Sequence, residues 1–215
     1  AWVVGDPDAL RSWAYLPDVA ATLATDVHVI GSPEARTTVD VVADISQGKA
    51  HLSVIVGYAA VVALLVLAAQ WRRHVEPRVT GSTAARVVSA GLTAAAGALA
   101  LGYGWKGAMS VYLPGGSDAA IGFDRTGLYV LYMLNDFGAY IGWLGVTVAA
   151  GAIAWMAFRE RTVSRWIGAV SLLPVLAVTV FVVATGLPGF PGVVTPVWMV
   201  VAFTGLAFGR STISR

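Results

Sequence analysis

Charged residues of both signs lie near the ends of apolar segments in the middle of the chain: Lys106, Asp124, Arg125 and Asp136. Lys106 follows one apolar segment and Asp136 directly precedes another, so these side chains are candidates for one polar cluster at an outer membrane face. A carboxylate in hydrocarbon needs a partner and is a functional candidate. Such a cluster would suit ion or solute transport if residues 127–134 dip into a membrane. If those residues lie flat on its surface, Asp136 caps a helix and pairs with Lys106 or Arg125.

A second group of potential ligands lies earlier in the chain, where Asp40, Asp44 and His51 follow helical spacing. Carboxylate and imidazole groups bind zinc, copper or iron. The helical rise separates Asp44 from His51 by about 10 Å, so one shared ion would require a bend at Gly48. These three residues are the metal candidates of the sequence, and a solvated polar face is the alternative interpretation.

The chain lacks the residues that most cofactors and catalytic centres need. It contains no cysteine, which excludes iron–sulfur clusters, thiolate zinc sites and cysteine nucleophiles. His51 and His74 flank opposite ends of one apolar segment, which disfavours haem ligation within the membrane. The common catalytic and nucleotide-binding motifs are absent from the sequence. We therefore expect no cofactor and favour a non-enzymatic role.

The composition indicates which elements must position these residues. Of the 215 residues, 57% are hydrophobic and 12% are charged, whereas soluble domains carry about 25% charged residues. The net charge of +2 is too balanced for a nucleic-acid-binding surface. A bilayer core requires about 20 apolar residues per helix. Five segments meet this requirement and predict an all-α integral membrane protein with a transmembrane bundle over residues 51–215: 52–71, 87–105, 137–158, 166–187 and 190–209.

Arginine and lysine residues predict the orientation of the bundle, because cytoplasmic loops are enriched in them. Nine are assigned to the cytoplasmic side: Arg72, Arg73, Arg78, Arg86, Arg159, Arg161, Arg165, Arg210 and Arg215. Five are assigned to the outside: Arg11, Arg36, Lys49, Lys106 and Arg125. This distribution predicts a multi-pass protein of the bacterial plasma membrane with its N-terminal region outside and its C-terminus in the cytoplasm.

The first 50 residues are expected to form a small helical extracytoplasmic cap. Asp6 before Pro7, and Ser32 before Pro33, are typical of helix starts. An outside N-terminal region needs either a removed signal peptide or a preceding span before Ala1. The second explanation would give six spans in the full gene product.

Small residues indicate how two of the predicted spans pack. Gly138 and Gly142 form a GxxxG pair, which allows close approach of two helix backbones. The segment 87–105 carries small residues at helical spacing, including Ala94 and Ala98. We predict that these two faces pack against each other within one bundle, and homodimerisation through the GxxxG pair is the alternative.

The last hundred residues carry three motifs that a membrane family shares. Asn135-Asp136-Phe137-Gly138 opens a span, Arg165-Trp166-Ile167-Gly168 ends a basic loop, and Gly186-Leu187-Pro188-Gly189 precedes a final apolar span containing Trp198. In these features the chain resembles uncharacterised multi-span membrane proteins of high-GC actinobacteria. The resemblance implies a fold and an origin, and it implies no activity or ligand.

The sequence favours a non-enzymatic accessory or structural subunit of a larger bacterial membrane complex. Its expected partners are the lipid bilayer and other membrane subunits or a second copy of itself, and nucleic acid is not among them. One alternative is a small-solute or ion transporter or channel that uses Asp136, Lys106 and Arg125. The other is a membrane enzyme with a metal site under the N-terminal cap.

Overall fold

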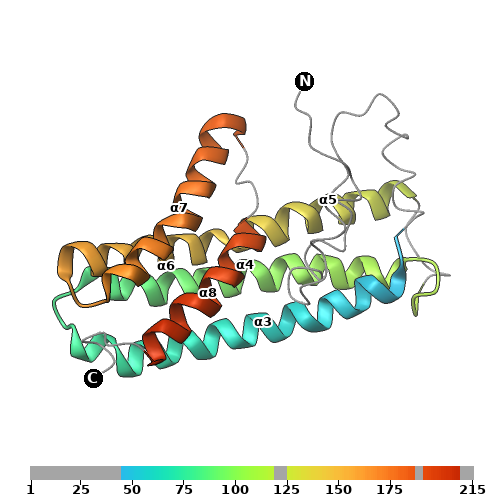
Figure 1. The fold of residues 1–215 in the computed structure, drawn as a ribbon. Coiled ribbons are helices and arrows are strands. Elements are labelled where there is room, and N and C mark those ends of the chain that lie inside the picture. Colours follow the sequence, from blue (N-terminus) through green and yellow to red (C-terminus); the bar gives the residue numbers. More distant parts are fainter. Residues whose placement is uncertain (1–44, 119–124, 187–190, 209–215) are drawn as a thin grey trace. The chain divides into compact units, whose positions relative to one another are not determined.

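The computed structural model describes residues 45–118, 125–186 and 191–208, and 87% of them are helical, with no strand among them. This confirms the predicted all-helical class for the described residues (Figure 1). The elements, in chain order, are α3 (Gln47–His74), the 3-10 helix η3 (Glu76–Arg78), α4 (Thr83–Tyr112), α5 (Arg125–Gly142), α6 (Leu144–Trp155), the π-helix η4 (Met156–Glu160), α7 (Arg165–Thr185) and α8 (Pro191–Phe208).

Four of these helices, α3, α4, α7 and α8, are long and apolar enough to cross a membrane. The 28 residues of α3 extend over about 42 Å at the α-helical rise, which exceeds a hydrocarbon core of about 30 Å. Large apolar side chains such as Leu52, Val62 and Val66 are exposed along this helix. A water-facing helix would place polar groups at such positions, whereas hydrocarbon favours apolar ones.

The predicted span over residues 137–158 has different boundaries in the structure. Helix α5 begins at Arg125, well before Phe137, and residues 127–134 are part of it. The helix then ends at Gly142. Trp143 forms a turn, and α6 begins at Leu144. No proline falls within residues 125–142 to end the helix early. Glycines, which lower helix stability, flank Trp143 closely at positions 142 and 145.

The described residues divide into two compact units, and three helices contribute to both. Unit 1 contains residues 45–59, 100–118 and 125–139, and unit 2 contains residues 60–99, 140–186 and 191–208. In unit 1 an apolar core joins the start of α3, the end of α4 and the first half of α5: Ala50, Met109, Leu113, Leu128 and Tyr132.

In unit 2 the short helix α6 is the most buried element. Val146, Ala149, Ala150 and Ile153 have no exposed surface, and α6 packs against both α7 and α8. Its small alanine side chains allow neighbouring helices to come close, so dispersion contacts are dense around it. Unit 2 is therefore assembled around α6.

Candidate functional site

The most unusual side chain of unit 1 is Lys106 in α4, which is 0% exposed. Its Nζ donates a hydrogen bond to Oγ of Ser53 in α3, at 2.7 Å, and Ser53 is itself buried. A buried ammonium is costly unless hydrogen bonds and charges around it compensate for lost hydration. An ionisable group at such a place is a functional candidate.

A glycine contact brings α3 close enough to α4 for this hydrogen bond. Gly57 packs on the ring of buried Tyr103, and a Cβ atom at residue 57 would overlap that ring. Only glycine therefore fits at residue 57 with the helices at their observed separation. The contact lies about one helical turn from Ser53 and Lys106 on the two helices, so it fixes their spacing near the lysine.

Asn135 of α5 is another buried polar residue of unit 1, at 0% exposed. Two contacts bracket it: Gly138 packs on Gly102 and Trp105, and Tyr132 belongs to the core that contains Met109. This antiparallel register places Asn135 at the level of Lys106 along α4. Neither its Oδ1 nor its Nδ2 has a hydrogen-bond partner among the described residues. An unpaired buried amide costs stability and marks a position that calls for a functional or structural reason.

The structure places two residues of the predicted polar cluster, Lys106 and Asp136, differently from the prediction. Lys106 is not a surface residue after a span, because α4 continues to Tyr112 and buries it. Asp136 does not cap a helix, because it lies inside α5, whose first residue is Arg125. The side chains of Arg125 and Asp136, and the whole of Asp124, lie outside the described residues.

Ser53 and Asn135 were missed as site residues by sequence reasoning. Ser53 is a single hydroxyl within a long uncharged run, where small polar residues are common and give no signal. Asn135 was noted as part of a motif, but its burial depends on the early start of α5. The sequence signal that could have identified Asn135 as buried is its amide side chain within an otherwise apolar stretch.

Two glycines of unit 2 bring helix backbones into direct contact. Gly145 of α6 packs on the Gly91 carbonyl and Ala95 of α4, and Gly91 in turn packs on the Gly145 carbonyl. At the end of α5, Gly142 packs on Leu99. Gly138, in unit 1, makes the matching contact with Gly102.

The α4 face that receives these glycines differs from the predicted one. Ala94 and Ala98 are exposed within the chain, so they do not form the face that contacts Gly142 and Gly145. The receiving residues Ala95 and Leu99 lie one position further along α4, which rotates the contact face by about 100°.

In unit 2, two glutamate carboxylates accept hydrogen bonds from serine hydroxyls, one just before α4 and one within it. Ser89 Oγ donates to Glu76 Oε1 at 2.5 Å, and Ser82 Oγ donates to Glu160 Oε2 at 2.6 Å. The second bond ties the end of η4 to the start of α4. These charge-assisted hydrogen bonds are stronger than neutral ones and fix the turns at this end of the helices.

The predicted metal candidates cannot be assembled from the described residues. Asp40 and Asp44 lie outside the described ranges, as does the rest of the predicted cap before residue 45, and His51 is exposed on α3. Within residues 45–118, 125–186 and 191–208, no three His, Asp or Glu side chains gather as a metal-binding group.

Comparisons with protein-family models, curated proteins and solved structures find no match to this chain.

Proposed function

We propose that this chain is a non-enzymatic integral membrane protein that acts as an accessory or structural subunit of a larger bacterial membrane complex. The observation that supports a packing role is the direct backbone contact at Gly91 and Gly145, matched by Gly102 and Gly138. These contacts leave no space for a solute between the paired helices at those points. Helices that meet through glycine form rigid pairs, as an assembly component requires.

The proposed topology has five crossings, of which α5, α6 and η4 together form the third. The arginine-rich turns after α3 and η4 face the cytoplasm of the plasma membrane, and the N-terminal region faces outside. Single cysteines at Ser32 and Thr80 test this orientation with an impermeant maleimide on intact cells. We expect labelling at residue 32 and none at residue 80, and the reverse pattern would contradict the proposal.

Native-membrane purification tests the assembly role. A tagged chain should co-purify with a fixed set of membrane proteins at constant stoichiometry. Gly145→Leu should disrupt this set because it forces α4 and α6 apart, whereas Gly97→Leu, at an exposed glycine with open space around it, should preserve it. Recovery of the unmodified chain alone, after mild extraction and cross-linking in intact membranes, would contradict the proposal.

A transporter is the second candidate, and the buried Lys106 favours it. Its Nζ, the Ser53 hydroxyl and the Asn135 amide place polar groups at one level of an otherwise apolar helical unit. Proteoliposomes containing the purified chain would then show charge movement or solute uptake. Lys106→Met would abolish it, while Lys49→Met, at an exposed lysine of α3, would not. If the proteoliposomes show no transport that depends on Lys106, the transporter is excluded and the subunit role remains the supported function.

A further inference from the structure

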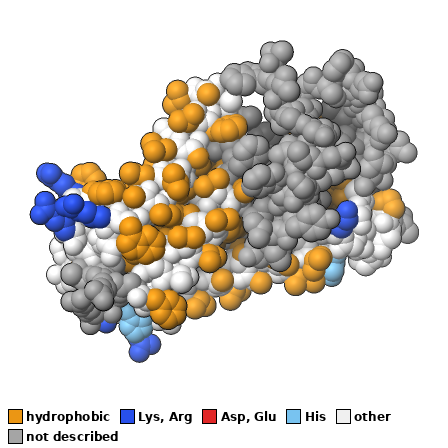
Figure 2. Space-filling model, in the orientation of Figure 1, with side chains coloured by type: hydrophobic (Ala, Val, Ile, Leu, Met, Phe, Trp, Pro, Cys, Tyr) orange, Lys and Arg blue, Asp and Glu red, His pale blue; other side chains and the backbone are white. Residues whose placement is uncertain are grey.

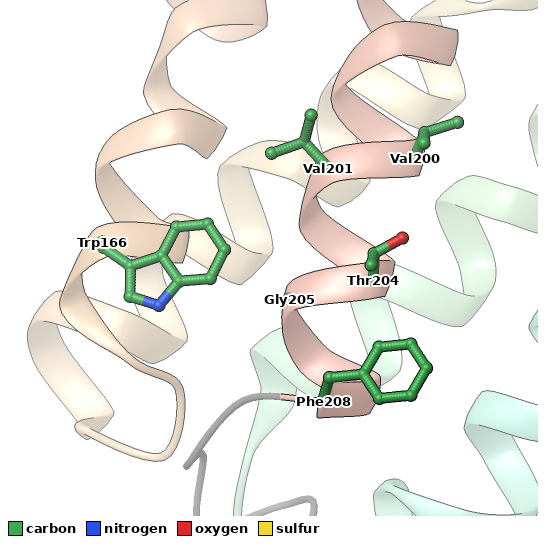
Figure 3. A pocket seen from close by; sticks show the side chains of 6 residues that line it. All are labelled: Trp166, Val200, Val201, Thr204, Gly205 and Phe208. Carbon is green, nitrogen blue, oxygen red and sulfur yellow. The ribbon is translucent and has the colours of Figure 1, made fainter.

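An open apolar hollow lies between the start of α7 and the end of α8 in unit 2 (Figure 3). Its volume is about 490 Å³, within the range of small-molecule sites. Its lining residues are Trp166, Val200, Val201, Thr204, Gly205 and Phe208. Apart from the Thr204 hydroxyl and the indole N–H of Trp166, the lining side chains present apolar groups, so the surface suits hydrocarbon rather than a polar solute.

The shape of the hollow depends on Gly205. The six-membered ring of Trp166 lies against Gly205, and a Cβ atom at this position would overlap it. Trp166 thus forms one wall while half of its own surface remains exposed, and Phe208 at the other end is 88% exposed. Between Val200 and Phe208 the hollow follows α8 for about 12 Å. An extended part of one acyl chain can lie along this length.

Positive charge lies beside this apolar surface. Arg165 directly precedes Trp166 and is exposed, as are Arg159 and Arg161 just before it in the chain. Figure 2 shows basic side chains gathered next to apolar side chains. The acids described in unit 2 are Glu76 and Glu160, and each accepts a hydrogen bond from a serine. In the stretch just before Trp166, the three arginines Arg159, Arg161 and Arg165 outnumber the single acid Glu160, so this stretch carries a net positive charge.

We infer that the hollow binds one acyl chain of an anionic phospholipid, whose phosphate is bound by Arg165. The guanidinium group pairs with phosphate through two parallel hydrogen bonds, and basic clusters at a membrane surface select anionic lipids. Tryptophan prefers the headgroup layer, where its ring contacts the upper part of the acyl chain. This inference rests on the proposed membrane placement but does not depend on the identity of any partner subunit.

Native mass spectrometry of the delipidated, purified chain tests the inference. Phosphatidylglycerol should bind at one tight site, about fivefold tighter than phosphatidylcholine with the same acyl chains. Arg165→Gln should remove this preference, whereas Arg73→Gln, at another exposed arginine of unit 2, should retain it. Thr204→Trp should fill the hollow and reduce binding of both lipids, and Val183→Trp, at an exposed position of α7 outside the hollow, should not.

Circular dichroism and elution volume identify variants that remain folded. Arg165→Gln, a surface change, keeps the test decisive if Thr204→Trp misfolds. Equal affinity for the two lipids, or an unchanged preference in Arg165→Gln, would overturn the inference. So would a folded Thr204→Trp variant that loses a co-purifying protein while its lipid binding is unchanged. Because the lipid measurement uses the isolated chain, it can fail while the assembly proposal stands, and the reverse also holds.

Discussion

The two units differ in what they bury between their helices. Unit 1 buries Lys106, two serines and Asn135, and the amide of Asn135 has no hydrogen-bond partner among the described residues. The buried polar groups of unit 2 are mostly hydroxyls with nearby acceptors: Ser171 donates to the Ile167 carbonyl and accepts from Nε1 of Trp198. The exception there is Nε1 of Trp143, which has no partner among the described residues.

The difference indicates separate roles for the two units. Locally satisfied hydroxyls cost little and allow unit 2 to be stabilised by close packing. A buried lysine loses its hydration on folding and must be held by specific partners, so its presence in unit 1 points to specificity or function. The comparison predicts that packing substitutions will matter most in unit 2 and polar substitutions most in unit 1.

The largest expected effect is Gly145→Leu in unit 2. Its Cβ atom alone would overlap the Gly91 carbonyl and lie 2.8 Å from the Ala95 nitrogen, so the backbones must separate. Overpacking of this kind costs about 3 kcal/mol or more when backbone must move. Thermal unfolding in detergent should show a large fall in Tm, and Gly97→Leu provides the matched control. Equal Tm values for the two variants would remove the packing basis of the comparison.

A smaller loss is expected from Lys106→Met in unit 1. The substitution retains most of the side-chain volume but removes the hydrogen bond that Lys106 Nζ donates to Ser53 Oγ. We expect destabilisation of about 1–3 kcal/mol. A double-mutant cycle with Ser53→Ala should show a coupling of about 1 kcal/mol or more between the two residues. Additive effects would mean that the buried hydrogen bond contributes nothing to the stability of unit 1.

Asn135→Leu should have the opposite sign. The variant replaces an amide lacking described partners by an apolar side chain of similar size, so the free energy of unfolding should rise by about 1 kcal/mol. Chemical unfolding of the purified protein measures this change. Loss of stability instead would show that the Asn135 amide forms hydrogen bonds in the folded protein. Unit 1 would then bury no more unpaired polar groups than unit 2.

The smallest effect is expected at Ala94, the exposed alanine of α4. Ala94→Leu adds bulk to a surface with no packing role in this chain, so stability should change by less than about 0.5 kcal/mol. Cross-linking of the variant in membranes supplies a second measurement. A clear loss of Tm, or of a cross-linked species that the unmodified chain forms, would place Ala94 in a helix interface.

The sequence by itself determined the helical class and the approximate positions of the long apolar helices. Residues 52–71 fall inside α3 and residues 87–105 inside α4, because an uncharged run of this length is a local property of the chain. Two of the glycines that mediate close helix contacts, Gly138 and Gly142, were also visible, since the GxxxG spacing places them on one face.

Only the tertiary structure decided which α4 face those glycines meet and which polar side chains become buried. Alanine, glycine and leucine occur all around α4, so the sequence offers several equivalent faces, and the rotation of the helix depends on its neighbours. Lys106 is buried because α4 extends past it and Gly57 lets α3 approach. That outcome depends on residues far apart in the chain, and no local pattern around Lys106 encodes it.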